Sequence, residues 1–180
     1  MAEALKQEQT LMPNLWFRLM ALEYRTRSNL PFTTEKLRQA GFSRGMRVVD
    51  FGCGPGRCTF PTASIVGEEG VVYAVDAHPL AIQMVEKAAR KAGLTNIKTI
   101  RSSCTTGLEP ETIDVALLFD TLHDVDDKEA VLGELHRVLR PKGRLLYKDH
   151  TLNGEHLIEL MRSSDFRVAS KSEILSFVKF

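Results

Sequence analysis

The stretch VVDFGCGPGRCT, residues 48–59, decides the fold. It opens on an apolar run that contains Asp50, and glycines follow at alternate positions, Gly52, Gly54 and Gly56. This pattern is typical of a buried strand that leads into a tight turn, because glycine adopts backbone conformations that other residues avoid. Such a loop brings backbone N–H groups close to a bound molecule, where side chains would collide with it. The stretch therefore predicts a strand followed by a ligand-binding loop.

Short β-rich runs alternate with longer helical ones from residue 46 onward, which is typical of a mostly parallel sheet flanked by helices. The five strands expected first are residues 46–51, 71–76, 97–101, 113–119 and 144–148. Three of these runs are almost continuously apolar, as parallel strands covered on both faces require. The tail, residues 153–180, reads as one more helix and two short strands. The fold class is therefore predicted to be α/β.

Two of the connecting helices have recognisable ends. Pro79 stands at a first helical position, and the run after it ends at Gly93. Asp126 precedes Glu129 by three residues, which is the spacing of a capping box. The apolar stripe that follows continues to Leu139, where we expect this second helix to end.

The first 40 residues are predicted to form helices ahead of the sheet. Apolar residues at positions 15, 16, 19, 20 and 22 follow a helical period, and a shorter helix is expected from Thr34 to Gly41. The sheet and its helices can be assembled without this segment. We therefore expect an N-terminal helical extension over residues 1–40 and one domain over residues 41–180. The extension either closes over the site as a lid or packs on the domain as a fixed helix.

Composition excludes several classes of protein. A chain of 180 residues that is 43% hydrophobic fits one domain, and a net charge of +1 does not favour a nucleic-acid partner. No apolar run approaches the ~20 residues of a membrane span, and the N-terminus lacks the pattern of a secretory signal. The three cysteines, Cys53, Cys58 and Cys104, are an odd number without zinc-site spacing, which favours reduced thiols in a cytoplasmic protein.

A second binding signal stands 20 residues after Gly56, where a predicted strand ends in Asp76. An acidic residue at this distance from a glycine loop can accept hydrogen bonds from ribose hydroxyls, in a nicotinamide site or an adenosylmethionine site. The dinucleotide motif is Gly-x-Gly-x-x-Gly, whereas the third glycine here comes one residue early. Asp76 alone therefore does not distinguish a nicotinamide cofactor from adenosylmethionine.

The whole pattern resembles the class I S-adenosylmethionine-dependent methyltransferases, and within them the UbiE-like branch of ubiquinone and menaquinone biosynthesis. The resemblance is carried by Asp50 and the three glycines, by Asp76, and by the segments FDTLHDV, residues 119–125, and LRPKGRLLYKD, residues 139–149. It implies a Rossmann-like sheet of seven strands, mostly parallel, with the last strand antiparallel and helices on both faces.

The resemblance also implies S-adenosylmethionine as the cofactor and a role for each matching residue. The glycine loop would pass beneath the methionine portion, Asp76 would hold the ribose, and Ala77 would pack against the adenine. The position after the third strand usually holds an acid, but here Ser103 stands there with Cys104 beside it. The implied cofactor-binding residues are Asp50, Gly52, Cys53, Gly54, Gly56, Asp76, Ala77, Ser103, Cys104 and Phe119.

Candidate catalytic residues follow the fourth strand at its carboxyl end, the edge at which open α/β sheets bind ligands. Asp120 and His123 stand there, and histidine accepts a proton near neutral pH without special tuning. Purely structural roles remain open for both, as a helix cap for Asp120 and as part of a helix under the cofactor for His123. His150, after the fifth strand, is a third candidate.

The function predicted from these residues is methyl transfer from S-adenosylmethionine to a small-molecule acceptor by in-line displacement, giving S-adenosylhomocysteine. No metal is expected. Two other functions stay open at this point. One is a module that binds S-adenosylmethionine without catalysis, and the other is an NAD(P)-dependent oxidoreductase that uses the same Asp76.

Overall fold

The structure is a computed structural model that describes residues 12–26, 34–149, 155–171 and 174–179. Its centre is a seven-stranded sheet in the order β3-β2-β1-β4-β5-β7-β6. The strands are β1 (Arg47–Phe51), β2 (Val71–Asp76), β3 (Ile97–Arg101), β4 (Ile113–Phe119), β5 (Leu139–Lys148), β6 (Phe166–Lys171) and β7 (Leu175–Lys179). The first five strands are parallel, and β7 runs antiparallel to both β5 and β6. The predicted sheet is confirmed.

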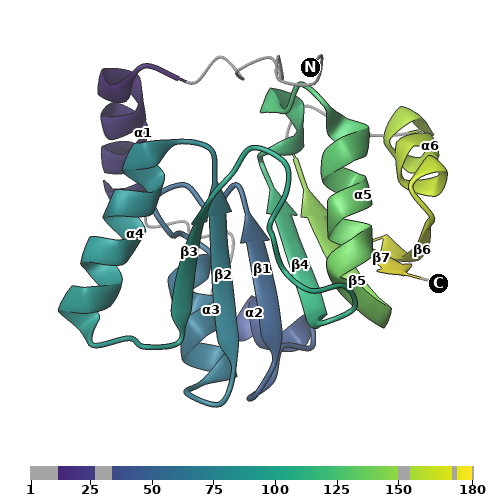
Figure 1. The fold of residues 1–180 in the computed structure, drawn as a ribbon, viewed down its shortest axis with the longest axis horizontal. Coiled ribbons are helices and arrows are strands. Elements are labelled where there is room, and N and C mark those ends of the chain that lie inside the picture. Colours follow the sequence, from purple (N-terminus) through teal and green to yellow (C-terminus); the bar gives the residue numbers. More distant parts are fainter. Residues whose placement is uncertain (1–11, 27–33, 150–154, 172–173, 180) are drawn as a thin grey trace, which may run out of the picture.

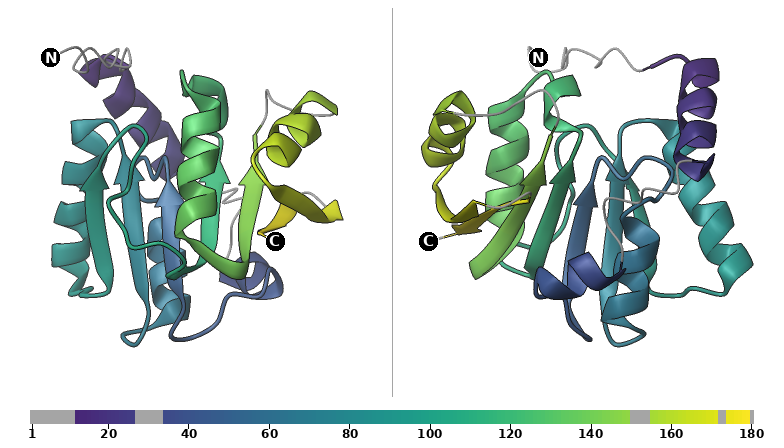
Figure 2. Two further views of the ribbon diagram at one scale, coloured as in Figure 1. Left: turned by 45° about the vertical axis from the view of Figure 1, so that its right-hand side comes forward. Right: turned by 180° about the vertical axis from the view of Figure 1, so that it is seen from behind.

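Helices cover both faces of this sheet (Figures 1 and 2). The helices are α1 (Asn14–Thr26), α2 (Thr34–Gln39), α3 (Thr59–Val66), α4 (Pro79–Ala92), α5 (Lys128–Val138) and α6 (Glu155–Ser163). Strand residues alternate between two apolar layers, as the period of two requires. Val49 and Phe51 face α5 and α6, whereas Val48 faces α2 and α3. None of the helices in the described ranges has the length and hydropathy that crossing a membrane requires.

The order of the strands positions the site. Strand β1 lies between β2 and β4. After β2 the chain continues to β3 on one side of the sheet, and after β4 it continues to β5 on the other side. A crevice forms where the strand order reverses, and it is the usual ligand site of an open α/β sheet. The glycine loop follows β1, and α1 stands beside the start of α4 at this same edge of the sheet (Figure 1).

Two predicted boundaries are wrong by small amounts. The N-cap of α5 is Asp127, whose side chain accepts a hydrogen bond from the Ala130 backbone N–H at 2.9 Å, and not Asp126. Leu139 belongs to β5 and not to the preceding helix, because its backbone is extended and it pairs with Ile113. Residues 140–143 then form a bulge before the regular pairing resumes, so β5 begins earlier than the predicted residue 144.

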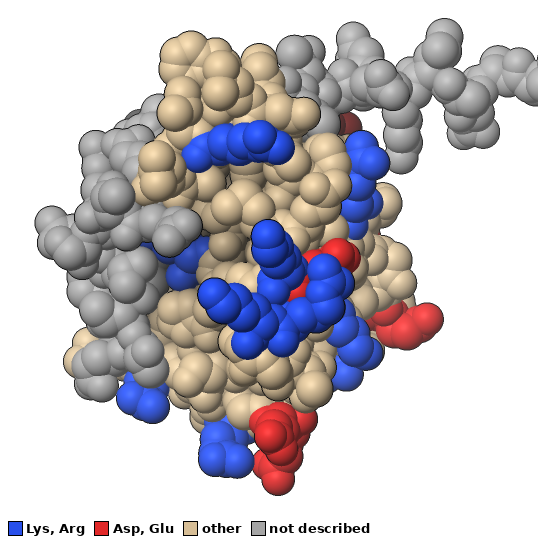
Figure 3. Space-filling view, turned by 90° about the vertical axis from the view of Figure 1, so that its left-hand side faces the viewer, with Lys and Arg blue, Asp and Glu red and all other residues tan. Residues whose placement is uncertain are grey.

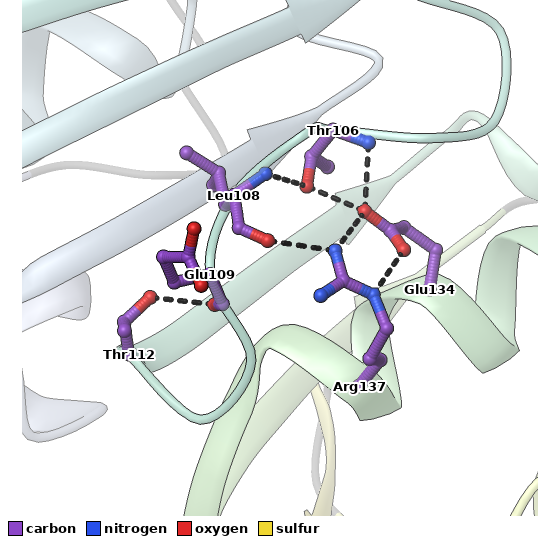
Figure 4. Close-up of polar contacts among 6 residues, drawn as sticks. All are labelled: Thr106, Leu108, Glu109, Thr112, Glu134 and Arg137. Atoms are coloured by element: carbon purple, nitrogen blue, oxygen red, sulfur yellow. Dashed lines mark hydrogen bonds and ion pairs between the residues drawn. The ribbon is translucent and has the colours of Figure 1, made fainter.

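A loop without a helix connects β3 to β4, and Glu134 of α5 fixes it in place (Figure 4). One carboxylate oxygen of Glu134 accepts hydrogen bonds from the Thr106 backbone N–H at 2.7 Å and from the Thr106 hydroxyl at 2.6 Å. The Arg137 guanidinium donates to both carboxylate oxygens and to the Leu108 carbonyl. Burial raises the pKa of the Glu134 carboxyl, but hydrogen bonds from Arg137 and Thr106 outweigh burial and lower it. This cluster anchors the loop that begins at the edge of the site.

Candidate cofactor and active site

A cavity of about 370 Å³ opens at the carboxyl ends of β1, β2 and β4. Most of the residues predicted from the sequence to form the site line it. Those that line it are Asp50, Gly52, Cys53, Gly54, Asp76, Ala77, Ser103, Phe119 and Asp120. Gly56, Cys104 and His123 are not among its lining residues, and His150 lies outside the described residues. The structure thus brings Asp50 and Asp120, which are 70 positions apart in the sequence, to one cavity.

The glycines of the loop have different physical requirements. All three have positive φ, which disfavours other residues. A Cβ on Gly52 would collide with the side chain of Thr121, and one on Gly56 would collide with the ring of Phe60. Nothing lies within 4 Å of the position that a Cβ on Gly54 would take. Gly54 therefore borders open space in the cavity, where a bound molecule can approach the backbone closely.

Asp76 holds the loop to the end of β2. One of its carboxylate oxygens accepts a hydrogen bond from the Gly54 backbone N–H at 2.8 Å, and the other accepts one from the His78 backbone N–H at 2.7 Å. Burial raises the pKa of the Asp76 carboxyl, and the two backbone hydrogen bonds oppose that rise. A carboxylate has about four acceptor positions. Asp76 therefore keeps acceptor capacity for the hydroxyls of a ribose.

Asp50 is a second buried carboxyl beneath the cavity. The Thr59 hydroxyl donates a hydrogen bond to it at 2.6 Å. Burial raises the pKa of Asp50 to about 6, the nearby charge of Asp76 contributes to the rise, and the Thr59 hydrogen bond opposes it. Desolvation penalises the charged form of an acid, so a cation placed in this cavity would relieve that penalty.

His78 connects the site to α1 and was not predicted from the sequence. Its Nδ1 accepts a hydrogen bond from the Leu80 backbone N–H at 3.2 Å and caps α4, while its Nε2 lies 2.9 Å from the Met12 carbonyl oxygen. The ring also stacks on Phe17 with a centroid separation of 4.2 Å. Met12, Phe17 and Met20 line the cavity from this side. The start of α1 therefore forms one wall of the site.

The candidate catalytic residues differ in how they reach the cavity. Asp120 lines it directly and is held at a positive φ of 47°. His123 lies in a short 3₁₀ turn, Leu122–Asp124, and its Nδ1 is 2.9 Å from a carboxylate oxygen of Asp149, whose side chain is fully buried. The Nε2 atom of His123 lies 3.4 Å from Asp124, which does line the cavity. A buried carboxylate thus orients the imidazole just behind the cavity wall.

Comparison with known proteins agrees with this geometry. A family model described as "Methyltransferase domain" matches residues 42–177. The chain belongs to this family. The methyltransferase domain therefore includes nearly the whole of the sheet, and the family identification made from the sequence motifs is confirmed.

Several relatives of this methyltransferase domain are methyltransferases by name. The chain is 32% identical over 104 residues to an aklanonic acid methyltransferase of Streptomyces sp. (strain C5), with 57% of this chain and 47% of that protein covered. It is 30% identical over 118 residues to a demethylmenaquinone methyltransferase of Geobacillus stearothermophilus, with 65% of this chain and 50% of that protein covered. The chain thus spans about half the length of these curated relatives.

A solved structure shares the fold of the methyltransferase domain over nearly its full length. It is a SAM-dependent methyltransferase from Aquifex aeolicus, with a TM-score of 0.79 and 22% sequence identity. The match covers 90% of this chain and 98% of that chain. At this level of identity the likeness shows the fold, which agrees with the sheet order described above.

The thiols of Cys53 and Cys58 are not activated. Burial raises the pKa of both the Cys53 and the Cys58 thiol well above the usual value, so both remain neutral near pH 7. The side chain of Cys104 packs against the hydrophobic core, and its backbone N–H donates to the Ser102 hydroxyl at 3.2 Å. The structure therefore gives these cysteines the environment of structural residues.

Some lining residues escaped the sequence analysis. Ser102, Thr121 and Asp124 each lie next to or near a predicted residue, so proximity in the sequence was the signal available for them. Met12 and Phe17 were expected on a lid but not assigned to contacts, because they reach the cavity only through tertiary packing on His78.

Proposed function

We propose that this chain transfers a methyl group from S-adenosylmethionine to a small-molecule acceptor by in-line displacement, releasing S-adenosylhomocysteine. One observation carries the proposal: Asp76 binds the backbone of Gly54, whose missing side chain leaves open space in a cavity of about 370 Å³. Membership of the methyltransferase family supports it. The relatives named above act, by their names, on aklanonic acid and demethylmenaquinone, which supports a small-molecule acceptor.

The residues present fit this cofactor. Asp76 would accept hydrogen bonds from the ribose, Gly54 would lie beneath the methionine portion, and Ala77 and Ser103 would face the adenine. When bound, S-adenosylmethionine supplies an electrophilic methyl group on a positively charged sulfur. The carboxyl groups of Asp50 and Asp76 favour that charge, and binding a cation would in turn lower their raised pKa values.

We assign proton acceptance to Asp120 and His123. Asp120 faces the cavity, and Asp149 holds the His123 ring with Nδ1 inward and Nε2 toward Asp124. Alignment of the reacting groups can supply ~7–11 kcal/mol of the barrier, whereas a general base contributes ~10²–10⁴-fold in rate. Loss of His123 should therefore slow the reaction far less than loss of the cofactor site.

We also assign a lid function to α1 within the N-terminal extension, residues 1–40, with the catalytic domain over residues 41–180. The stack of Phe17 on His78 and the position of Met20 in the cavity wall support this assignment. A cytoplasmic location is part of the proposal, because all three cysteines are free thiols, as expected in a reducing compartment.

Thermal unfolding with and without S-adenosylmethionine tests the proposal. A ligand at 100 times its Kd stabilises the protein by ~2.7 kcal/mol, so the melting temperature should rise. Asp76→Ala should remove most of this rise, because each hydrogen bond to a charged acceptor contributes ~1.5–3 kcal/mol. Glu69→Ala, at an exposed acid in the turn before β2, is the matched control and should keep the full rise.

Two outcomes would contradict the proposal. A shift produced by NADH and not by S-adenosylmethionine would identify a nicotinamide site at Asp76. Binding of S-adenosylmethionine without S-adenosylhomocysteine appearing by mass spectrometry, across acceptors that include demethylmenaquinone, would favour a module that binds the cofactor without catalysis.

A further inference from the structure

Within the part of the chain that the structure describes, the large hydrophobic side chains that are exposed all belong to one short segment. Among the described residues, this set consists of Met12, Leu15, Trp16, Leu19 and Leu22, with exposed fractions of 42% to 67%. Met12 lines the cavity, whereas the spacing of the other four places them along one side of α1. We call Leu15, Trp16, Leu19 and Leu22 the α1 stripe. A concentration of exposed apolar side chains on one helix indicates an interaction surface.

The opposite side of α1 already has its partners. Phe17 and Ala21 are buried, and Phe17 stacks on His78. The helix is therefore attached to the domain by one apolar side while a second apolar side faces outward. A helix that is apolar on most of its circumference is ordinarily buried on all of it. Among the described residues, none covers the α1 stripe as its apolar composition would require.

Basic side chains gather on the same side of the molecule, over α4 and β3. Lys87, Arg90 and Lys91 are exposed at helical spacing on α4, and Arg101 is exposed on the adjoining strand β3. We call these four residues the α4 cluster. Figure 3 shows a surface of mostly uncharged residues, crossed by a basic side chain, above a dense group of Lys and Arg side chains that has acidic side chains beside it. Glu86 pairs with Arg90 at 3.9 Å within this group, and the remaining basic side chains leave a local excess of positive charge.

We propose that the α1 stripe and the α4 cluster together dock on the surface of an anionic lipid bilayer. Tryptophan and leucine side chains insert at the boundary between headgroups and acyl chains, while lysine and arginine bind the lipid phosphates. On this side the exposed apolar residues of α1 adjoin basic side chains, which fits the apolar interior and the negatively charged phosphates of such a bilayer (Figure 3). No described helix spans a bilayer, so the contact is a peripheral one.

Other occupants fit this surface less well. In a symmetric dimer a patch meets its own copy, so the α4 clusters of two chains would approach each other and repel. A nucleic acid would neutralise the basic side chains but would leave the aliphatic stripe exposed to water. A bilayer accommodates both features at once. Docking on lipid does not require methyl transfer, so this proposal stands apart from the proposed function.

The full-length chain carries its own probe, because Trp16 is the only tryptophan in the sequence and belongs to the α1 stripe. Its fluorescence emission should shift to the blue when vesicles of phosphatidylcholine and phosphatidylserine are added. Vesicles of phosphatidylcholine alone should produce a much smaller shift. Brominated lipids should quench the emission, and added salt should weaken the binding.

Three double variants separate the contributions. Leu15→Ser with Leu19→Ser removes apolar surface, and Lys87→Glu with Lys91→Glu reverses charge in the α4 cluster. Each should weaken co-sedimentation with the anionic vesicles by about tenfold or more. The control, Arg38→Glu with Arg162→Glu, changes the net charge equally at exposed residues of α2 and α6 and should bind like the parent chain. Circular dichroism melting curves check that all variants remain folded.

Several results would overturn the proposal. An unchanged Trp16 emission with anionic vesicles would show that the stripe does not contact lipid. A blue shift that depends on protein concentration without vesicles would show that a second copy covers the stripe. Equal loss of binding in the control variant would show that attraction depends on net charge and not on this surface.

Discussion

Asp50 at the glycine loop and Glu134 on α5 are both buried carboxyl groups, yet their pKa values move in opposite directions. Burial raises both. Glu134 faces a guanidinium and a hydroxyl that more than compensate, so its pKa is lowered. Asp50 is held by the neutral hydroxyl of Thr59, and its pKa rises to about 6. Arg137 thus compensates the charge of Glu134, whereas the ionised form of Asp50 lowers the stability of the folded chain.

This difference separates a structural carboxylate from a functional one. The Glu134 cluster ties a loop to a helix and is complete without any ligand (Figure 4). Asp50 and Asp76 instead leave negative charge beside an open cavity, where a cationic ligand would find it. Strongly shifted pKa values in a cleft are a recognised sign of a functional site. The comparison can be tested by removing each group in turn.

The largest effect is expected for Glu134→Ala. This change removes the acceptor of hydrogen bonds from Thr106 and Arg137 and leaves a partly buried cation without its counter-charge. Leaving the buried backbone N–H and hydroxyl of Thr106 without their acceptor costs about 1–3 kcal/mol of unfolding free energy for each donor. Urea denaturation at pH 7 measures it, with Glu129→Ala, an exposed acid of the same helix, as the control. An equal loss of unfolding free energy in Glu134→Ala and Glu129→Ala would show that the hydrogen bonds of Glu134 do not stabilise the fold.

Asp50→Asn should raise the free energy of unfolding near neutral pH, whereas Glu134→Ala lowers it. The pKa of Asp50 is 3.8 when unperturbed and about 6 in the folded chain, so between these values the folded state holds a proton that the unfolded state has lost. Parent stability therefore falls, relative to the variant, as pH rises from about 4 to about 6. Above pH 6 the variant should be more stable by up to about 3 kcal/mol.

Urea unfolding at pH 4 and pH 7 checks the Asp50→Asn prediction. The two proteins should be nearly equal at pH 4 and should diverge at pH 7. Asp114→Asn is the contrasting control, because Asp114 forms an ion pair with Arg140 at 2.7 Å and its loss should destabilise at pH 7. A pH-independent difference for Asp50→Asn would mean that this carboxyl is not strained by burial.

The smallest effect is expected for Arg90→Ala. Arg90 pairs with Glu86 at 3.9 Å on the surface of α4, with side chains 74% and 41% exposed. Exposed pairs at this helical spacing contribute only about 0.3–0.5 kcal/mol, because water and salt screen them. Thermal melting should therefore barely change. A loss above about 1 kcal/mol would show that burial is not what distinguishes Glu134 from an ordinary surface pair.

Local sequence rules predicted most of the fold. The strands at 71–76, 97–101 and 113–119 have the bounds that were expected, and α4 begins at Pro79 and ends before Gly93, which has the left-handed conformation of a helix C-cap. Apolar periodicity and glycine placement are properties of neighbouring residues, so they can be recognised directly in the sequence. The edge of the sheet that holds the site followed from the same information.

Contacts between distant residues could not be predicted in this way. His123 and Asp149 are 26 positions apart, and only the register of β4 against β5 brings them within hydrogen-bonding distance. The choice between Asp126 and Asp127 as N-cap depends on which side chain reaches a backbone N–H. Leu139 would complete the apolar stripe of α5 equally well as a helical residue, and its pairing with Ile113 decides otherwise.

The ring of His78 imposes a proton assignment that spectroscopy can read. Its Nδ1 accepts from a backbone N–H, and its Nε2 faces a carbonyl oxygen, so both bonds form only when the neutral ring carries its hydrogen on Nε2. Nitrogen-15 chemical shifts distinguish the two tautomers of imidazole directly. The Nε2–H tautomer of the His78 ring therefore joins the cap of α4 to the entry of α1, and detaching α1 should appear first as a tautomeric mixture at His78.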